Sequence, residues 1–319
     1  MSEPLTQPPT PAPQNAGDKL DELREKIKEY VEDLEDLSHE YDLPDFAADD
    51  LRAELEYISK EANNADLAKS VKEVVELAAG ALDEQLEKAL EHGKELRNAY
   101  DNNNILDMFR SAVKIYANLK TINTIVQYLK QYVKVLGITE ANLERFTQEA
   151  GSIIAILANH IAQHVKLSED DARDLENDLI YYHDLAENWT DIEDALEEIE
   201  DDLENDTEFK RGTYKALMKV LNAMQEHGKK GVGYGNGADE IVYDAYDSDE
   251  DEYKPDEIDV ETLLLNLAET YAHFIALQAL YNNIMSEYIS NEKLEDATKK
   301  AINRAKDAQE IILSSYNSN

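Results

Sequence analysis

The sequence predicts an all-α protein, an elongated multi-helix bundle of about eight long helices with coiled-coil-like heptad packing. Three observations indicate this class. Apolar residues recur every three or four positions through almost all of the chain after residue 17. Only 11 of the 319 residues are glycine and 7 are proline, so turns are few. Charged residues make up 32% of the chain, as long solvent-exposed helical faces require.

The N-terminal region predicts a tail followed by a helix. Residues 1–17 are proline-rich, with neither the basic nor the apolar region of a signal peptide, so we expect a disordered tail. The next helix ends at Leu43-Pro44, since proline disfavours helical backbone in the residue before it. Its narrow apolar seam predicts pairing with another copy, with another protein, or with the following helix. The seam consists of Leu20, Leu23, Ile27, Tyr30, Leu34, Leu37 and Tyr41.

The middle of the chain predicts three more helical regions. The second covers residues 49–100, with a break at Asn63-Asn64. The third runs from Ile105 to about residue 136, and its wide apolar stripe predicts a central position, with Gly137 just past its end. The polar stretch from Asp101 to Asn104 caps the third helix, and Thr139 caps the fourth, which runs to about residue 165. The third and fourth form a near-neutral hairpin that we expect to be the core.

The remainder predicts four helices and a long loop. A fifth helix begins at Ser168 with a capping box and breaks or kinks near Trp189. A sixth, basic helix covers 208–227. Glycine-rich and then acidic residues predict a flexible loop over 228–257, with a strand only at 241–243. Helices over 259–289 and 292–315 follow. The predicted units are therefore a bundle over 18–227, the loop over 228–257, and a C-terminal helical pair over 258–319 that packs on the same bundle.

Charge is distributed unevenly along the chain, whose net charge is −39. Residues 168–207 carry −17, whereas residues 208–236 carry +4. Such a surface repels nucleic acid and anionic lipid, and no run of about 18 apolar residues is present, so neither direct nucleic-acid binding nor a membrane partner is expected. Two explanations of the acidity stay open: a basic protein partner, and adaptation to a high-salt host. The basic helix either docks on the acidic fifth helix or presents a positive site.

Motifs that carry chemistry are weak in this sequence. His160 and His164 share a helix face, but no third metal ligand is evident. Glu269 and His273 form a similar pair without a partner. Asp247, Asp249 and Asp251 resemble the start of a calcium loop, but the essential glycine is replaced by Glu252. The glycines after residue 230 follow a helix and match no phosphate-binding motif, which favours a hinge. No catalytic residue, metal or cofactor is therefore expected.

These observations predict a non-enzymatic structural, assembly or adaptor protein that acts through helix–helix contacts with a protein partner or a second copy, as in a virion or scaffold component. The alternative is an acidic decoy, or a chaperone, for a basic DNA-binding protein. The absence of a signal peptide and of a membrane span predicts a cytoplasmic or virion-associated protein. The candidate interaction residues are Leu20, Leu23, Ile27, Leu34 and Leu37 of the seam, Lys210, Arg211, Lys215 and Lys219 of the basic helix, and Tyr243, Tyr246, Asp249 and Asp251 of the acidic loop.

Overall fold

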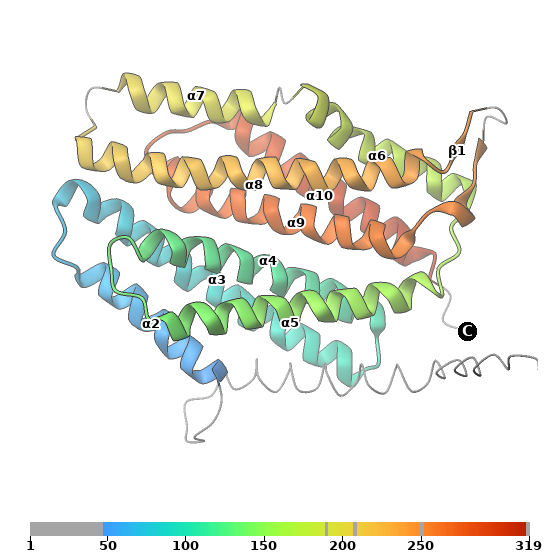
Figure 1. Cartoon of the computed structure of the whole chain (residues 1–319), viewed down its shortest axis with the longest axis horizontal. Coiled ribbons are helices and arrows are strands. Elements are labelled where there is room, and N and C mark those ends of the chain that lie inside the picture. The colour runs from blue at the N-terminus through green and yellow to red at the C-terminus, as the bar shows by residue number, and fades with distance from the viewer. Residues whose placement is uncertain (1–46, 189–190, 207–208, 249–251, 317–319) are drawn as a thin grey trace, which may run out of the picture.

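The computed structural model describes residues 47–188, 191–206, 209–248 and 252–316. These residues form nine α-helices and one two-stranded hairpin, which confirms the all-α prediction. Figure 1 shows the helices in two groups, α2–α5 below and α6–α10 above. The first group comprises α2 (Ala47–Asn64), α3 (Lys69–Asp101), α4 (Ile105–Leu129) and α5 (Gly137–Ala162). The second comprises α6 (Glu169–Asn188), α7 (Ile192–Asn205), α8 (Arg211–Tyr243), α9 (Val260–Asn283) and α10 (Glu292–Ser314), with short 3-10 turns at Pro255–Glu257 and Met285–Glu287.

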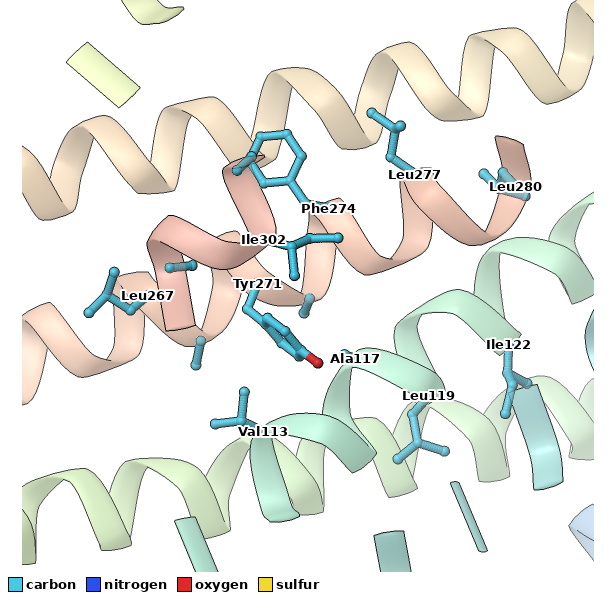
Figure 2. Close-up of a cluster of buried hydrophobic side chains, with 14 of the residues drawn as sticks. Val113, Ala117, Leu119, Ile122, Leu267, Tyr271, Phe274, Leu277, Leu280 and Ile302 are labelled. Atoms are coloured by element: carbon cyan, nitrogen blue, oxygen red, sulfur yellow. The ribbon is translucent and has the colours of Figure 1, made fainter. Parts of the chain in front are cut away.

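Helix α9 joins the two groups. It packs on α3, α4 and α5 of the first group and on α8 and α10 of the second. Its side chains are buried nearly all round, and Figure 2 shows Tyr271 pointing towards α4 while Phe274 points towards α8. The expectation that the α4–α5 hairpin alone forms the core is therefore incomplete, because α9 shares that position.

Helix α9 also bears on the membrane prediction. The segment Val260–Glu287 is long and apolar enough to span a bilayer by composition, and it is the one such segment in the part of the chain that the structure describes. Within it, 72% of the most apolar window is buried by the other helices. Packing against neighbouring helices therefore accounts for its hydropathy.

Several helix starts have the side-chain caps that the sequence predicts. Asn104 accepts a hydrogen bond from the backbone N–H of Asp107 at 3.2 Å. Ser168 and Asp171 form a reciprocal capping box, with bonds of 3.1 and 2.7 Å. The helix over 168–207 is split into α6 and α7, as the Trp189 region predicts. Two predictions at one boundary are wrong. Gly137 does not follow a helix but begins α5, whereas α4 ends at Leu129, and Thr139 lies inside α5 and does not cap it.

The predicted glycine-rich loop is wrong, because α8 continues as one helix to Tyr243. Three of its glycines, at positions 228, 231 and 235, recur at helical spacing on one buried face. A Cβ atom at Gly231 would lie 2.9 Å from the ring of Phe274, and one at Gly235 would lie 2.4 Å from Tyr182. Each glycine weakens an isolated helix by about 1 kcal/mol, and here that cost is offset by close packing on α6 and α9. These glycines therefore make room for large aromatic side chains of neighbouring helices, and they do not form a hinge.

The acidic half of the predicted loop is a short hairpin. Strand β1 (Tyr246–Asp247) pairs antiparallel with β2 (Glu252–Tyr253), so that Tyr246 is opposite Tyr253 with ring centroids 5.1 Å apart. Tyr253 is buried against the bundle. The strand expected at 241–243 is wrong, since those residues end α8.

Candidate functional site

A groove lies between α4 and α8, above α9. Helices α4 and α8 both pack extensively on α9 but scarcely on each other, so they diverge and leave a pocket of about 380 Å³. Of its twelve lining residues, all but Ala223 have a side chain with a polar group. The lining residues are Lys120, Asn123, Thr124, Gln127, Tyr128 and Gln131 from α4, Lys219, Ala223, Glu226, His227 and Lys230 from α8, and His273 from α9.

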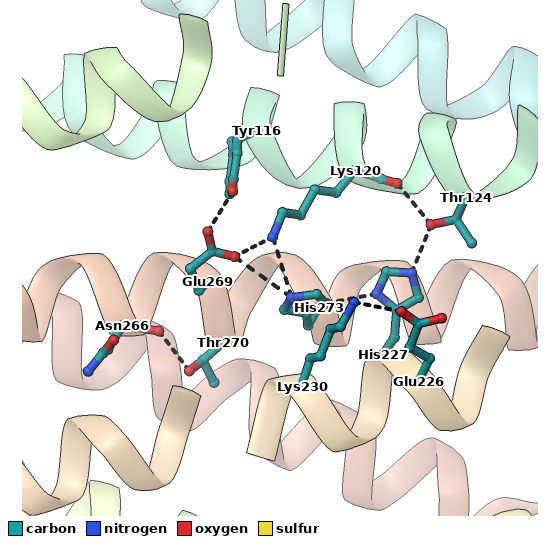
Figure 3. A network of polar contacts seen from close by, with 10 residues as sticks. All are labelled: Tyr116, Lys120, Thr124, Glu226, His227, Lys230, Asn266, Glu269, Thr270 and His273. Atoms are coloured by element: carbon teal, nitrogen blue, oxygen red, sulfur yellow. Dashed lines mark hydrogen bonds and ion pairs between the residues drawn. The ribbon is translucent and has the colours of Figure 1, made fainter. Parts of the chain in front are cut away.

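A three-residue ionic cluster anchors one end of the groove. Lys120 donates to Oε2 of Glu269, and the hydroxyl of Tyr116 donates to Oε1 of the same carboxylate at 2.6 Å (Figure 3). Lys120 and Glu269 are only 19% and 24% exposed, so each charge needs the other. Burial and the neighbouring carboxylate raise the pKa of Tyr116 well above its ordinary value. The phenol therefore keeps its proton and its bond to Glu269.

Two histidines from different helices meet beside this cluster, at the floor of the groove. The ring of His273 is buried, and Tyr234 stacks on it with centroids 5.7 Å apart. Burial lowers the pKa of His273 to about 2, and the ammonium of Lys120 adds to the effect. Burial also lowers the pKa of His227 to about 4, against the opposing effect of Glu226. Both imidazoles are therefore neutral at pH 7.

Hydrogen-bond directions define the tautomers of these neutral rings. The single hydroxyl proton of Thr124 lies in its 3.0 Å bond to the carbonyl of Lys120. Nε2 of His227, 2.8 Å from that hydroxyl oxygen, must therefore donate. Its Nδ1 is then an acceptor and receives the Nδ1 proton of His273 at 2.9 Å. Nε2 of His273 is left to accept from the Lys120 ammonium at 3.4 Å.

This chain of bonds occupies all four imidazole nitrogens (Figure 3). Neither histidine has a lone pair left to take a proton from a molecule in the groove. Additional protonation of either ring would place two N–H groups, or an N–H and an ammonium, against each other. The arrangement therefore favours a rigid binding surface over acid–base catalysis.

The sequence indicates Glu269 and His273 only as a metal-ligand pair that lacks a second pair; the structure shows a different role for them, in hydrogen bonds. Lys120, Tyr116 and His227 are their partners. His227 itself was not singled out from the sequence. The only signal in the sequence was weak: polar residues at positions 116, 120 and 124 recur every fourth residue, but the same helix carries other polar residues as well.

The other histidine pair, His160 and His164 at the end of α5, makes a different set of contacts. The rings of His160 and His164 stack with centroids 4.4 Å apart, and Nε2 of His160 lies 3.3 Å from the hydroxyl of Tyr316. Nδ1 of His164 donates to the carbonyl of His160 at 2.8 Å. Across the described residues, no group of three or more side chains could hold a metal ion.

The basic helix lies beside α6 and α7 as predicted, but its cations do not pair with their carboxylates in the part of the chain that is described. Gln225 makes the polar contact instead, donating to Glu200 at 3.2 Å. Lys210, Arg211 and Lys215 are exposed. Lys219 differs, because its ammonium lies 5.2 Å from the centre of the Tyr132 ring, at the edge of the groove.

Of the other predicted interaction residues, the structure describes some and leaves others outside the described ranges. Tyr243 is 63% exposed at the end of α8, and Tyr246 lies in β1. Asp247 pairs with Lys254, away from any calcium-loop geometry. Asp249 and Asp251 lie outside the described residues, as do Leu20, Leu23, Ile27, Leu34 and Leu37 of the seam. Of the three predicted sets, the structure describes only the basic one in full, and its residues lie at the N-cap and along the first turns of α8.

Comparison with known proteins finds no match: no family model, no curated protein and no solved structure resembles the chain significantly.

Proposed function

We propose that the protein is a non-enzymatic adaptor or assembly protein that binds a protein partner with a basic surface. The polar cluster supports the first part of this proposal. Its histidines, lysine and glutamate are hydrogen-bonded to one another across three helices, and burial keeps both imidazoles neutral at pH 7. Groups in this condition stabilise a fold or shape a binding surface.

The observation that carries the proposal is the outer face of α7. This helix has eight carboxylates and no lysine or arginine among its 14 residues. One side is buried through Ile192, Leu196, Ile199 and Leu203. Of the acidic side chains, Glu193, Glu197 and Glu200 line a hollow shared with Gln225 and Lys229 of α8, and the others lie on the exposed side. Glu198 pairs with Lys293, and Glu200 accepts from Gln225. The other six form no ion pair with a described residue; they are Glu193, Asp194, Glu197, Asp201, Asp202 and Glu204.

Unpaired like charges on one helix repel one another and weaken the fold slightly. A basic partner relieves that repulsion and is steered towards the face by its field. The two earlier explanations of the acidity therefore differ in a measurable way. Partner binding requires the α7 face in particular, whereas adaptation to high salt requires only acidic surface in general.

Charge reversal on α7 tests the proposal. We expect Glu193→Lys/Glu197→Lys/Asp201→Lys to weaken binding of a lysine- and arginine-rich DNA-binding domain at least tenfold, with helicity and mass by light scattering unchanged. The matched control, Glu61→Lys/Glu91→Lys/Glu295→Lys, changes the net charge equally at exposed sites on α2, α3 and α10 and should bind nearly as wild type. Equal losses in both variants would contradict a specific α7 site.

The same assay separates an adaptor from the second candidate, an acidic decoy, which the row of unpaired carboxylates also favours. A decoy occupies the surface that DNA uses, so it should release duplex DNA from the basic domain in proportion to its own binding. An adaptor should bind with the DNA still in place. Fluorescence anisotropy of labelled DNA during the titration measures the difference.

A further inference from the structure

The groove between α4 and α8 is a basic site in an acidic protein. Three lysine ammoniums, Lys120, Lys219 and Lys230, line it against one carboxylate, Glu226, whereas the whole chain carries −39. The charge of Lys120 is matched by Glu269 beside it, and Lys230 pairs with Glu226 at 2.6 Å. Lys219 has no carboxylate partner among the described residues and rests on the Tyr132 ring. An ammonium in this position is available to an anion in the groove.

Unused hydrogen-bonding groups lie in the same groove. The hydroxyl of Tyr128 is buried and makes no hydrogen bond of good geometry, although the nearby Tyr132 contributes to the raised pKa of its phenol. The half-buried amides of Asn123 and Gln127 make no side-chain hydrogen bond to another described residue. Buried polar groups in native proteins almost always have partners. A ligand in the groove would supply them.

We propose that this groove binds a small phosphate ester. Lys219 would supply the uncompensated charge, and Lys230, which the anion would share with Glu226, a second cationic donor. Asn123, Gln127 and Tyr128 would supply hydrogen bonds, and the neutral histidine pair a rigid floor. The volume of about 380 Å³ falls within the range of small-molecule sites, roughly 300–1,000 Å³. A compact anion meets the repulsion of the surrounding carboxylates over a small volume, whereas a nucleic acid strand would meet it along its whole length. The inference is independent of partner binding at α7.

Calorimetric titration at constant ionic strength tests the proposal, with phenyl phosphate, inorganic phosphate and succinate as probes. We expect phenyl phosphate to bind most tightly, because its ring adds contact with the groove wall, and succinate to bind at least tenfold more weakly. Lys219→Gln/Lys230→Gln should weaken phenyl phosphate binding at least tenfold. Both side chains are exposed, so the thermal midpoint of this variant should change little.

Two further variants make the result decisive. Lys215→Gln/Lys229→Gln removes the same charge from exposed positions of the same helix, outside the groove, and should change the affinity less than twofold. Tyr128→Phe removes a hydroxyl that makes no hydrogen bond of good geometry, so it should leave stability unchanged or higher while weakening phenyl phosphate binding several-fold. Absence of binding by all three probes, equal weakening by the two lysine double variants, or tighter binding of succinate would each overturn the proposal.

Discussion

This protein has two histidine pairs whose rings lie at similar distances from each other but whose positions, burial and hydrogen bonds differ. The rings of His160 and His164 lie 4.4 Å apart, and those of His227 and His273 lie 5.1 Å apart. In the first pair, His160 is in the last turn of α5 and His164 is in the turn just after the helix, and both side chains are half-buried. The second joins α8 to α9 across 46 residues of sequence.

The difference lies in what the nitrogen atoms bind. Just after α5, His164 donates from its Nδ1 to the backbone carbonyl of His160, a contact between residues four apart in the sequence. Between α8 and α9, each ring bonds to the other and to groups on α4. Burial lowers the pKa of His160, with His164 contributing, but it lowers the pKa of His273 to about 2. Helical spacing brings side chains together, whereas only packing between helices buries and orders them.

The largest expected effect is on the pH dependence of stability. In the unfolded chain each imidazole takes up a proton below about pH 6.5. In the folded protein His227 stays neutral to about pH 4 and His273 to about pH 2. The unfolded state therefore binds more protons, and the free energy of unfolding falls as the pH drops below 6.5. The two rings together should account for a loss of roughly 4–5 kcal/mol between pH 6.5 and 4.5.

Urea denaturation of two double variants over that pH range measures this difference. His227→Gln/His273→Gln should show a markedly shallower decline than wild type, whatever its stability at pH 7. His160→Gln/His164→Gln should decline nearly as wild type, because its rings are closer to solvent. Parallel curves for the two double variants would show that the buried pair is no different from the exposed one.

A smaller effect is expected from separating α8 from its neighbours. Gly235→Ala places a Cβ 2.4 Å from Tyr182, whose ring stacks on Phe274, the residue after His273. Overpacking of this kind costs about 1–3 kcal/mol and should also loosen the His227–His273 contact while leaving the α5 pair unchanged. Histidine ring signals in NMR spectra, recorded with the denaturation curve, report both.

Gly233→Ala is the matched control, since a Cβ there meets nothing within 4 Å. It should stabilise the protein by about 0.5–1 kcal/mol through helix propensity alone. Destabilisation at both positions would mean that α8 needs glycine for flexibility and not for close packing.

The last comparison concerns the hydroxyl that each pair contacts, and its second arm, at Tyr316, has the smallest effect expected of these substitutions. Thr124→Val leaves the Nε2 proton of His227 without an acceptor and should cost about 1–3 kcal/mol, whereas Thr124→Ser keeps the hydroxyl and should cost much less. Tyr316→Phe removes the hydroxyl 3.3 Å from His160 near the surface and should change stability by less than about 0.5 kcal/mol. Similar losses for Thr124→Val and Tyr316→Phe would remove the distinction between the two pairs.

Helix boundaries that depend on side-chain caps were predictable, because a cap is formed within one turn. Asn104 and Ser168 are examples. The glycines of α8 were misread as a loop, since glycine propensity describes an isolated helix and not one packed against aromatic rings. Gly235 is explained only by Tyr182, which lies on a different helix. The groove was not predictable either. Its lining residues come from three helices, and nothing in the sequence indicates that these helices pack together.

The sequence by itself determined that the chain is helical, where most helices begin and which segments carry the acid, because periodicity, caps and charge are local properties. The tertiary structure decided that α9 is central, that glycines seat Phe274 and Tyr182, and that His227 bonds to His273. It also decided the protonation of that pair, since the pKa of a side chain depends on its burial and its neighbours in space. The basic groove in an acidic protein arises in the same way, because lysines on α4 and α8 line the same groove only after these helices pack on α9.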